Sequence, residues 1–152
     1  MILAVDVGNS NTTVGLFNGT GELLFRALLE TSRSKTRDQC AIELLGVFQL
    51  YGADACTVDG AILSSVVPPL TTIFTDAIAR LTGIPPMVVG PGIRTGLNIK
   101  AEIHNQLGSD IVASSVAAIA KYPSPIVMVD MGTATSLSLI VGSVYEGCII
   151  MP

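Results

Sequence analysis

The sequence is poor in charged and aromatic residues and has few cysteines. Only 13% of its 152 residues are charged and 5% are aromatic, whereas 49% are hydrophobic, and the mean hydropathy is +0.63. No apolar run approaches the ~20 residues that a membrane-spanning helix needs, so we expect no membrane association. A chain this apolar either buries most of its surface in its own core or covers an apolar face with a partner.

Basic residues and paired cysteines are also scarce. Eight Lys and Arg stand against twelve Asp and Glu, for a net charge of −4 and a pI near 4.7, which argues against a nucleic-acid-binding protein. No basic segment precedes the first apolar run, and Asp6 interrupts that run, which argues against a signal peptide. Cys40, Cys56 and Cys148 lack the CxxC spacing of zinc and redox sites. We therefore expect buried, reduced thiols and a cytoplasmic protein.

What the sequence does contain is a regular order of apolar segments and turns. Apolar runs at 2–7, 12–18 and 22–30 predict three antiparallel strands. Residues 91–106 read as a loop. The remaining periodicity predicts a helix over 38–51 that is capped by Asp38, a helix from Pro68-Pro69 to Leu81, and a helix over 110–121 that is buried on more than one side. It also predicts strands over 60–67, 86–90, 126–130, 136–141 and 144–150. This order indicates one α/β domain, residues 1–152, with a mixed sheet.

Asp6 is out of place in the first strand, which otherwise reads as buried. A carboxylate there needs a partner, a cation or a functional reason. The turn Gly8-Asn9-Ser10-Asn11 follows it, and Gly and Asn tolerate the positive φ of tight turns.

The pattern occurs twice, because Asp130 and Gly132 repeat Asp6 and Gly8 at the end of another apolar strand. Glycine turns with open backbone N–H groups bind phosphates, and a neighbouring Asp can hold a hydrated cation that bridges to them. Two such hairpins closing on one nucleotide would explain both carboxylates. The alternative is that each Asp merely caps its turn, since short glycine motifs give frequent false positives.

Five motifs in order make the sequence similar to the type III pantothenate kinase family, within the actin-like ATPase and sugar-kinase superfamily. They run through the whole chain: Asp6-x-Gly8-Asn9-Ser10-x-x-x-x-Gly15, Ser64-Ser65-Val66-Val67-Pro68, Gly90-Pro-Gly-x-x-Thr95-Gly96-Leu97, Gly108-x-Asp110 and Asp130-x-Gly132-Thr133-Ala134-Thr135. The resemblance implies a ribonuclease H-like α/β fold with three antiparallel N-terminal strands. It also implies phosphorylation of pantothenate by ATP, the first step of coenzyme A synthesis, with magnesium and a monovalent cation, potassium or ammonium.

The resemblance assigns roles by position. Asp110 matches the acceptor of the substrate hydroxyl's proton, Asp130 the ligand of the monovalent cation and Thr133 a second nucleotide contact. Asp6 is the candidate magnesium ligand. The phosphate loop comprises Asp6, Val7, Gly8, Asn9, Ser10, Asn11, Thr12 and Thr13, and the substrate-binding residues are Gly108, Ser109, Asp110 and Ile111. Without the resemblance, Asp110 would read as an ordinary helix N-terminal carboxylate stabilised by the helix dipole.

The sequence departs from the family pattern mainly in the pantothenate half. Ile111 replaces an Arg that would make charge-assisted bonds to the substrate, and Ala101 replaces a substrate-contacting Tyr. Ile103-His104 stands where the family has Asn-Pro, and Gly147-Cys148-Ile149 replaces Gly-Gly-Ala. The only histidine, His104, reads as a solvated loop residue. Three functions stay open: a pantothenate kinase, a nucleotide-binding or regulatory relative without activity, and a kinase of another small hydroxyl substrate.

The family also carries a second domain of similar fold, and the nucleotide binds between the two. The chain stops at an apolar strand without a closing helix, so we expect a fragment, a truncated gene product or a partner chain that completes it. Family members resemble obligate dimers, and we expect a homodimer that binds a small-molecule substrate.

Overall fold

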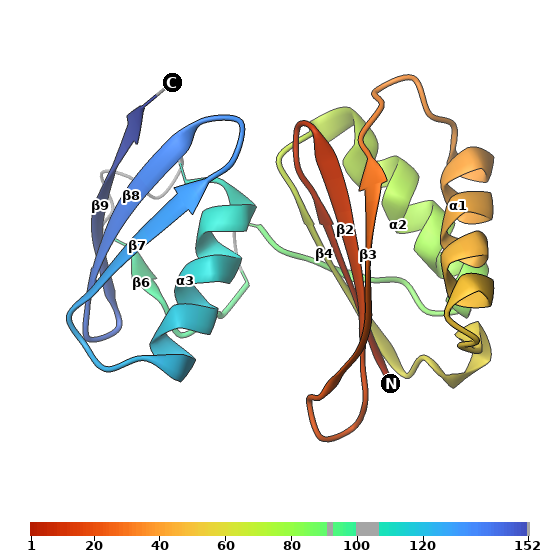
Figure 1. Ribbon diagram of the computed structural model, residues 1–152, viewed down its shortest axis with the longest axis horizontal. Coiled ribbons are helices and arrows are strands. Elements are labelled where there is room, and N and C mark those ends of the chain that lie inside the picture. Colours follow the sequence, from red (N-terminus) through yellow and green to blue (C-terminus); the bar gives the residue numbers. More distant parts are fainter. Residues whose placement is uncertain (91–92, 100–106, 152) are drawn as a thin grey trace. The chain divides into compact units, whose positions relative to one another are not determined.

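The chain folds into two compact units in a computed structural model that describes residues 1–90, 93–99 and 107–151. The units comprise residues 1–89 and 90–152 (Figure 1). The expected three antiparallel strands, the flanking helices and the mixed sheet all lie in the first unit. The second unit has a smaller sheet of its own, and each unit is described by itself.

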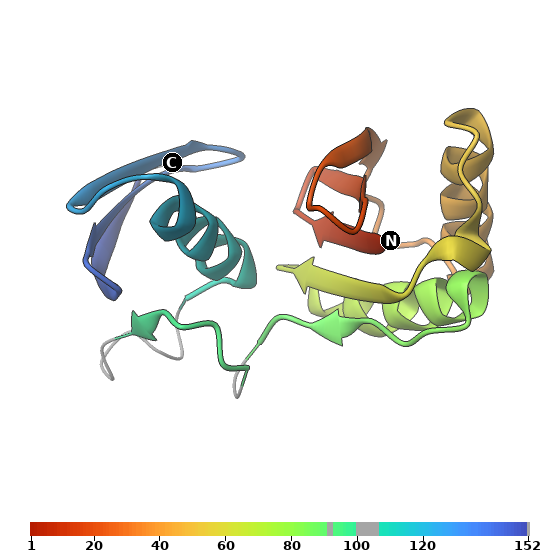
Figure 2. The ribbon, with the colours of Figure 1, turned by 90° about the horizontal axis from the view of Figure 1, so that it is seen from below.

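The first unit is a five-stranded mixed sheet in the order β3-β2-β1-β4-β5. β1 pairs antiparallel with β2 and parallel with β4, and β2 pairs antiparallel with β3. Helices α1 and α2 lie on one face of this sheet (Figures 1 and 2). The elements are β1 (Ile2–Val7), β2 (Asn11–Phe17), β3 (Leu23–Glu30), α1 (Arg37–Leu50), a 3₁₀ turn at Ala55–Thr57, β4 (Gly60–Ser65), α2 (Pro68–Thr82) and β5 (Met87–Val88).

Alternation along β1 determines which side chains face the helices. Leu3, Val5 and Val7 are buried, whereas Ile2 and Asp6 are exposed. The buried set packs with the inner sides of α1 and α2, whose buried residues are Cys40, Leu44, Val47, Phe48, Leu70, Phe74, Ala77 and Ile78. The main core of the molecule is therefore between one sheet face and two helices.

The start of α1 differs from the sequence prediction. Its N-cap is Thr36 rather than Asp38, which lies in the first helical turn. The Thr36 hydroxyl accepts from Gln39 N at 3.3 Å, and the Gln39 side chain accepts from Thr36 N at 2.8 Å. This reciprocal pair is a capping box, and it satisfies two backbone donors where a lone Asp38 cap would satisfy one.

Helix α2 begins where the sequence predicted. Pro68 and Pro69 occupy its first turn, where a missing N–H costs nothing, and Gly83 ends it in a left-handed conformation with φ of 75°. Its buried residues are Leu70, Phe74, Ala77 and Ile78, which lie on the predicted apolar face.

The second unit is a four-stranded sheet in the order β6-β9-β8-β7, with one helix packed against β7. The loop predicted over 91–106 contains a short strand, β6, that pairs parallel with β9. The elements are β6 (Asn98–Ile99), α3 (Ser109–Lys121), β7 (Ile126–Met131), β8 (Thr135–Val141) and β9 (Val144–Met151).

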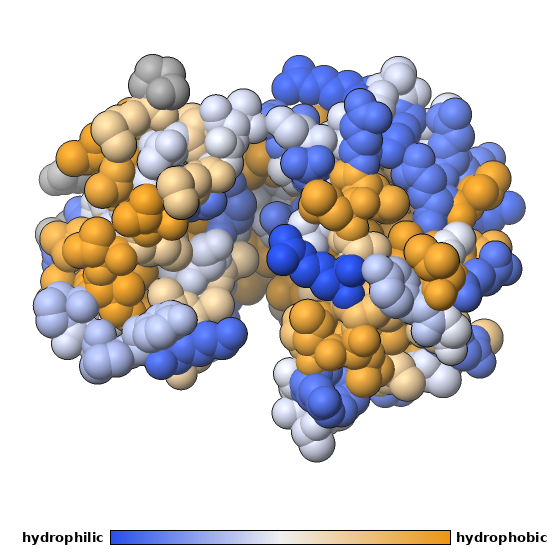
Figure 3. Space-filling model, viewed as in Figure 1, coloured by the Kyte–Doolittle hydropathy of each residue, from blue (hydrophilic) through white to orange (hydrophobic). Residues whose placement is uncertain are grey.

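The core of the second unit is small. Its buried apolar residues are Ala118, Ile126, Ile140 and Tyr145. The prediction that the third helix is buried on more than one side was wrong, since only Ser115 and Ala118 of α3 are buried. Alanine- and valine-rich composition predicted a packed helix, but only one side of α3 meets the sheet. Apolar side chains reach the surface in both units, as the orange areas of Figure 3 show.

The three cysteines are thiols, as expected, but only Cys40 is buried. Cys56 and Cys148 are exposed, so the prediction of buried thiols holds for one residue of three. None of the helices in the described ranges is both long enough and apolar enough to cross a membrane.

Candidate nucleotide and substrate site

Asp6 projects from the sheet face opposite the two helices. Its neighbours in register are Thr13 on β2 and Ser64 on β4, and its own side chain is exposed between buried Val5 and Val7. The expectation of a carboxylate in buried surroundings was therefore wrong, because strand alternation turns Asp6 away from the core. Asp6 thus places a carboxylate, a possible cation ligand, beside two hydroxyl-bearing residues near the ends of β1 and β4.

The turn after Asp6 is closed by its own backbone. Gly8 N donates to Asn11 O at 3.0 Å, so this amide is used inside the turn rather than left open for an anion. The turn also forms without positive φ at Gly8, Asn9 or Asn11, contrary to the sequence argument. Glycine fits here for another reason: a Cβ at Gly8 would lie 3.0 Å from Asn11 O.

Two of the predicted phosphate-loop side chains serve the fold. Val7 is buried in the core, and its carbonyl accepts from Val66 N at 3.0 Å. The buried Thr12 hydroxyl lies 2.8 Å from the Thr31 hydroxyl. The exposed members of the loop are Asp6, Asn9, Ser10 and Asn11.

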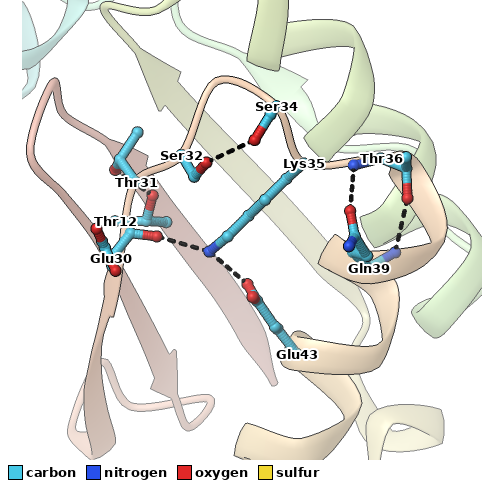
Figure 4. A network of polar contacts seen from close by, with 9 residues as sticks. All are labelled: Thr12, Glu30, Thr31, Ser32, Ser34, Lys35, Thr36, Gln39 and Glu43. Carbon is cyan, nitrogen blue, oxygen red and sulfur yellow. Dashed lines mark hydrogen bonds and ion pairs between the residues drawn. The ribbon is translucent and has the colours of Figure 1, made fainter.

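A polar segment, residues 31–36, follows β3 (Figure 4). It contacts this turn, a role that sequence reasoning missed. Thr31 N donates to Ser10 O at 3.0 Å, which extends the β2–β3 pairing up to the turn. Arg33 Nη2 then approaches Asn9 Oδ1 at 3.4 Å, which brings a guanidinium to the loop. The charge was visible in the sequence, but its position depends on the β2–β3 register.

The second basic residue of the segment has a structural role instead. Lys35 Nζ donates to Glu30 O at 2.6 Å and to Glu43 Oε2 at 2.9 Å, which ties the segment to α1 (Figure 4). With its side chain 16% exposed, Lys35 is held in place by the fold. Arg33 is thus the basic residue of this segment that is exposed beside the first turn.

The second hairpin repeats the first. Asp130 is exposed near the end of β7, opposite Ser136 on β8, and Gly132 N donates to Ala134 O at 3.2 Å. As in the first turn, the glycine amide is used internally, so the predicted open amide is wrong here too. A Cβ at Gly132 would meet nothing closer than 3.7 Å, so the turn itself does not require glycine. The predicted nucleotide contact Thr133 is exposed beside it.

Asp110 lies in the first turn of α3, as predicted, and is partly buried. Its Oδ1 accepts from Ile111 N at 2.8 Å, and the N-cap Gly108 provides no side-chain cap. An acidic side chain in the first turn of a helix is favoured by the positive end of the helix dipole. Ser109 begins the helix, and the Ile111 side chain packs against the unit's apolar core.

A buried tyrosine lies under this region. Tyr145 is fully buried, and its hydroxyl is 2.9 Å from the Ser138 hydroxyl. Burial, together with Cys148 and the negative charge of Asp110, raises the pKa of Tyr145 to about 12.

The structure therefore brings Asp110, Asp130 and Thr133 into one unit, and Asp6 and Arg33 into the other. Ala101, Ile103 and His104, where the sequence departs from the family pattern, lie outside the described residues. Among the residues that are described, no three His, Cys, Asp or Glu side chains gather closely enough to hold a metal ion. A lone carboxylate can hold magnesium without such a cluster, because this ion completes its shell with water and phosphate oxygens.

Comparison with known proteins decides the family. The profile of the type III pantothenate kinases matches residues 2–152. The chain belongs to the type III pantothenate kinase family. It is 40% identical over 153 residues to the type III pantothenate kinase of Listeria monocytogenes serotype 4a, and the match covers 100% of this chain and 59% of that relative. The chain thus spans about three fifths of the length of this relative.

Solved structures agree on the fold. A reductive activator for a corrinoid, iron–sulfur protein matches with a TM-score of 0.59 at 12% identity, over 97% of this chain and 30% of its own. The ethanolamine utilization protein EutJ from Carboxydothermus hydrogenoformans matches with a TM-score of 0.53 at 14% identity, over 99% and 51%. The predicted class, an actin-like ATPase and sugar-kinase fold, is confirmed.

Proposed function

We propose that the protein containing this chain phosphorylates pantothenate with ATP to give 4'-phosphopantothenate, the first step of coenzyme A synthesis. The family membership supports the reaction. The observation that supports the site is the repeated hairpin, in which an exposed Asp is followed two residues later by a turn glycine, once in each unit. In this proposal the Asp of each hairpin contributes to nucleotide binding.

The nucleotide half would use charge neutralisation. Phosphoryl transfer depends on positioning and on cations that offset phosphate charge, more than on covalent help from the protein. Asp6 would hold magnesium and Asp130 a monovalent cation, with Arg33 as an additional positive group beside the first turn. Bound magnesium would supply neutralisation of the phosphate oxygens. The turn at Gly132 has room for a side chain, so the turn itself does not require glycine. The absence of a side chain there would let a ligand approach the backbone closely.

The acceptor half would centre on Asp110. A carboxylate next to the attacking hydroxyl orients it and accepts its proton. Asp110 lies in the first turn of α3, and Gly108 and Ser109 form the same end of that helix. The residues that hold the cations would thus differ from the residue that accepts the proton, and no covalent intermediate would be required.

One observation favours a different function. Ile111 packs into the apolar core, where the family pattern has an Arg available to the substrate. A nucleotide-binding relative without pantothenate turnover, or a kinase of another small hydroxyl substrate, would fit this change.

A coupled assay on the full-length protein, with magnesium and potassium or ammonium, distinguishes these functions. Pantothenate-dependent ADP formation is the expected result, and nucleotide binding without such turnover would overturn the kinase proposal. Ile111→Arg combined with Ala101→Tyr then tests the pocket directly, since a gain in pantothenate turnover would show that these two positions limit it.

We further propose that the protein acts in the cytoplasm as a homodimer, without nucleic acid or membrane as partner. The acidic composition and the apolar surface of both units support this proposal. Sedimentation of the full-length protein would test it, and a stable monomer at micromolar concentration would contradict it.

A further inference from the structure

The motif Ser64-Ser65-Val66-Val67-Pro68 leads from β4 into α2, and the fold accounts for its last three residues. Val66 N donates to Val7 O at 3.0 Å, which continues the pairing of β4 with β1. Val67 is buried in the main core, and Pro68 begins α2. These three residues therefore serve the connection between the strand and the helix.

The two serines of the motif differ in their surroundings. The Ser65 hydroxyl donates to Val67 O and accepts from Val67 N, both at 3.2 Å, which fixes the turn into α2. Ser64 lies on the sheet face opposite α1 and α2, because strand alternation turns Leu63 toward the helices. Yet Ser64 is only 6% exposed, whereas Ile62 on the same face is 37% exposed. The two helices of this unit therefore do not account for the burial of Ser64.

Asp6 is the residue paired with Ser64 in the sheet. β1 and β4 run parallel, and their register sets Asp6 opposite Ser64. Paired residues of neighbouring strands project from the same face about 5 Å apart, which brings a serine hydroxyl within hydrogen-bonding reach of an aspartate carboxylate. On the other side of β4, the pairing with β5 involves Ile62 and Leu63 and stops short of Ser64 in the described part of the sheet. Asp6 is thus the paired neighbour to which Ser64 can donate.

A serine and an aspartate placed in this way have complementary chemistry. Buried hydroxyl groups are nearly always hydrogen-bonded, and a serine hydroxyl can donate where a carboxylate only accepts. We propose that the Ser64 hydroxyl donates to the Asp6 carboxylate and that Ser64 is a positioning residue for that carboxylate. The bond to one oxygen would hold the carboxylate in a single orientation, with the other oxygen directed at the cation.

The second hairpin lacks this arrangement. Asp130 pairs with Ser136 on β8, but β7 is an edge strand of the sheet as described, so no strand is paired on the other side of Asp130. Asp6 pairs with hydroxyl-bearing residues on both sides, Thr13 on β2 and Ser64 on β4. Support on two sides suits a magnesium ligand, because magnesium demands near-ideal octahedral geometry. The effect on magnesium rests on the proposed function, whereas the contact between Ser64 and Asp6 does not.

Hydrogen exchange tests the contact itself, in the full-length protein without nucleotide. Ser64→Ala should lower the protection of the amides in β1 and β4 about fivefold, the net contribution of one hydrogen bond. The same change in an Asp6→Ala background should lower this protection less than about twofold, because the partner is already absent. Equal losses in the two backgrounds would overturn the proposal, since the hydroxyl would then bond to another group.

Calorimetric titration tests the positioning role. Ser64→Ala should raise the dissociation constant of magnesium–ATP about tenfold, the usual effect of losing a residue that holds a metal ligand in place. The dissociation constant of ATP without magnesium should change less than about twofold, because the lost contact acts through the cation. Ser64→Thr keeps the hydroxyl and should bind magnesium–ATP as the wild type does. Equal weakening with and without magnesium, or no weakening with it, would refute the positioning role.

Ser65→Ala is the matched control for both measurements. It removes a hydroxyl one residue away and loosens the turn into α2, but it should leave both dissociation constants unchanged. Asp6→Ala separates this inference from the proposed function. If Asp6→Ala leaves magnesium–ATP binding unchanged, Asp6 does not hold the cation, and the exchange measurement alone decides whether Ser64 bonds to it. If Asp6→Ala weakens binding while the exchange losses are equal, the proposed role of Asp6 stands and the Ser64 contact is refuted.

Discussion

The two units present the same hairpin in different surroundings. β1, β2 and β3 have six, seven and eight residues, and β7, β8 and β9 have the same three lengths. Asp6 and Asp130 occupy corresponding positions in their first strands. Yet Val5 is 2% exposed, whereas its counterpart Val129 is 53% exposed. Similar strand sequences therefore do not determine burial, which depends on what packs against each face.

The difference lies in which face is covered. In the first unit, α1 and α2 pack on the face that carries Leu3, Val5 and Val7. In the second unit, α3 packs against Ile126, so the helix meets the opposite face, the one that carries the Asp. Asp6 consequently projects from an uncovered face, while Asp130 shares a face with the residues under α3. The same Asp-x-Gly motif therefore lies on the sheet face opposite the helices in one unit and on the face that meets the helix in the other.

The largest expected effect concerns the acceptor base. Asp110→Asn in the full-length protein should lower turnover on the order of a hundredfold or more, because a general base is lost, and leave ATP affinity largely unchanged. Asp76→Asn, a carboxylate on the exposed side of α2, is a suitable control. Loss of ATP binding in Asp110→Asn would place this residue with the nucleotide instead.

The second effect is a loss of stability at alkaline pH, which we expect to be confined to the second unit. The pKa of Tyr145 is about 12 in the folded state, above its ordinary value of 10.0, chiefly because burial disfavours the charged form. The contribution of Tyr145 to stability is therefore constant below pH 10 and is lost between about pH 10 and 12, by up to about 3 kcal/mol. Tyrosinate absorbance and amide hydrogen exchange would follow it. Tyr145→Phe should remove this pH dependence, and an unchanged profile in that variant would contradict the assignment.

A matched pair of truncations sharpens the comparison of the two faces. In this 152-residue chain Val5→Ala should lower the free energy of unfolding by about 2 kcal/mol, because it leaves a cavity in the main core. Val129→Ala should cost about 0.5 kcal/mol or less. Hydrogen exchange of β1 and β7 would measure each locally. Equal costs would mean that the face of β7 is covered in solution.

The smallest effect distinguishes the roles of two basic residues near the first turn, Arg33 and Lys35. Arg33→Ala should weaken ATP binding about tenfold, since a charge-assisted phosphate contact is lost, with little change in stability. Lys35→Ala should do the reverse and cost about 1 kcal/mol of stability, because it breaks the ion pair with Glu43. Calorimetric titration and denaturant unfolding of both variants would test this division of roles.

Much of the fold could be predicted because its signals are local. Strand alternation located β1 to β3, Pro68-Pro69 located the start of α2, and the Asp-x-Gly motifs located both hairpins. The cap of α1 was misassigned because both Thr36 and Asp38 are good cap residues, and only the reciprocal bonds with Gln39 distinguish them.

The candidate site was less predictable because it depends on tertiary structure. Arg33 reaches the first turn only through the β2–β3 register, and the exposure of Asp6 depends on which sheet face the helices cover. Composition likewise gave no sign that α3 is covered on one side only. Such features depend on contacts between residues far apart in the sequence.

The central claim is that Asp6 and Asp130 both support nucleotide binding. Titration calorimetry of the full-length protein with magnesium–ATP, for the wild type, Asp6→Asn and Asp130→Asn, tests it most directly. We predict that either change weakens binding about tenfold or more, because in the proposed function each removes a carboxylate that holds a cation against the phosphates. Wild-type affinity in either variant would contradict the claim.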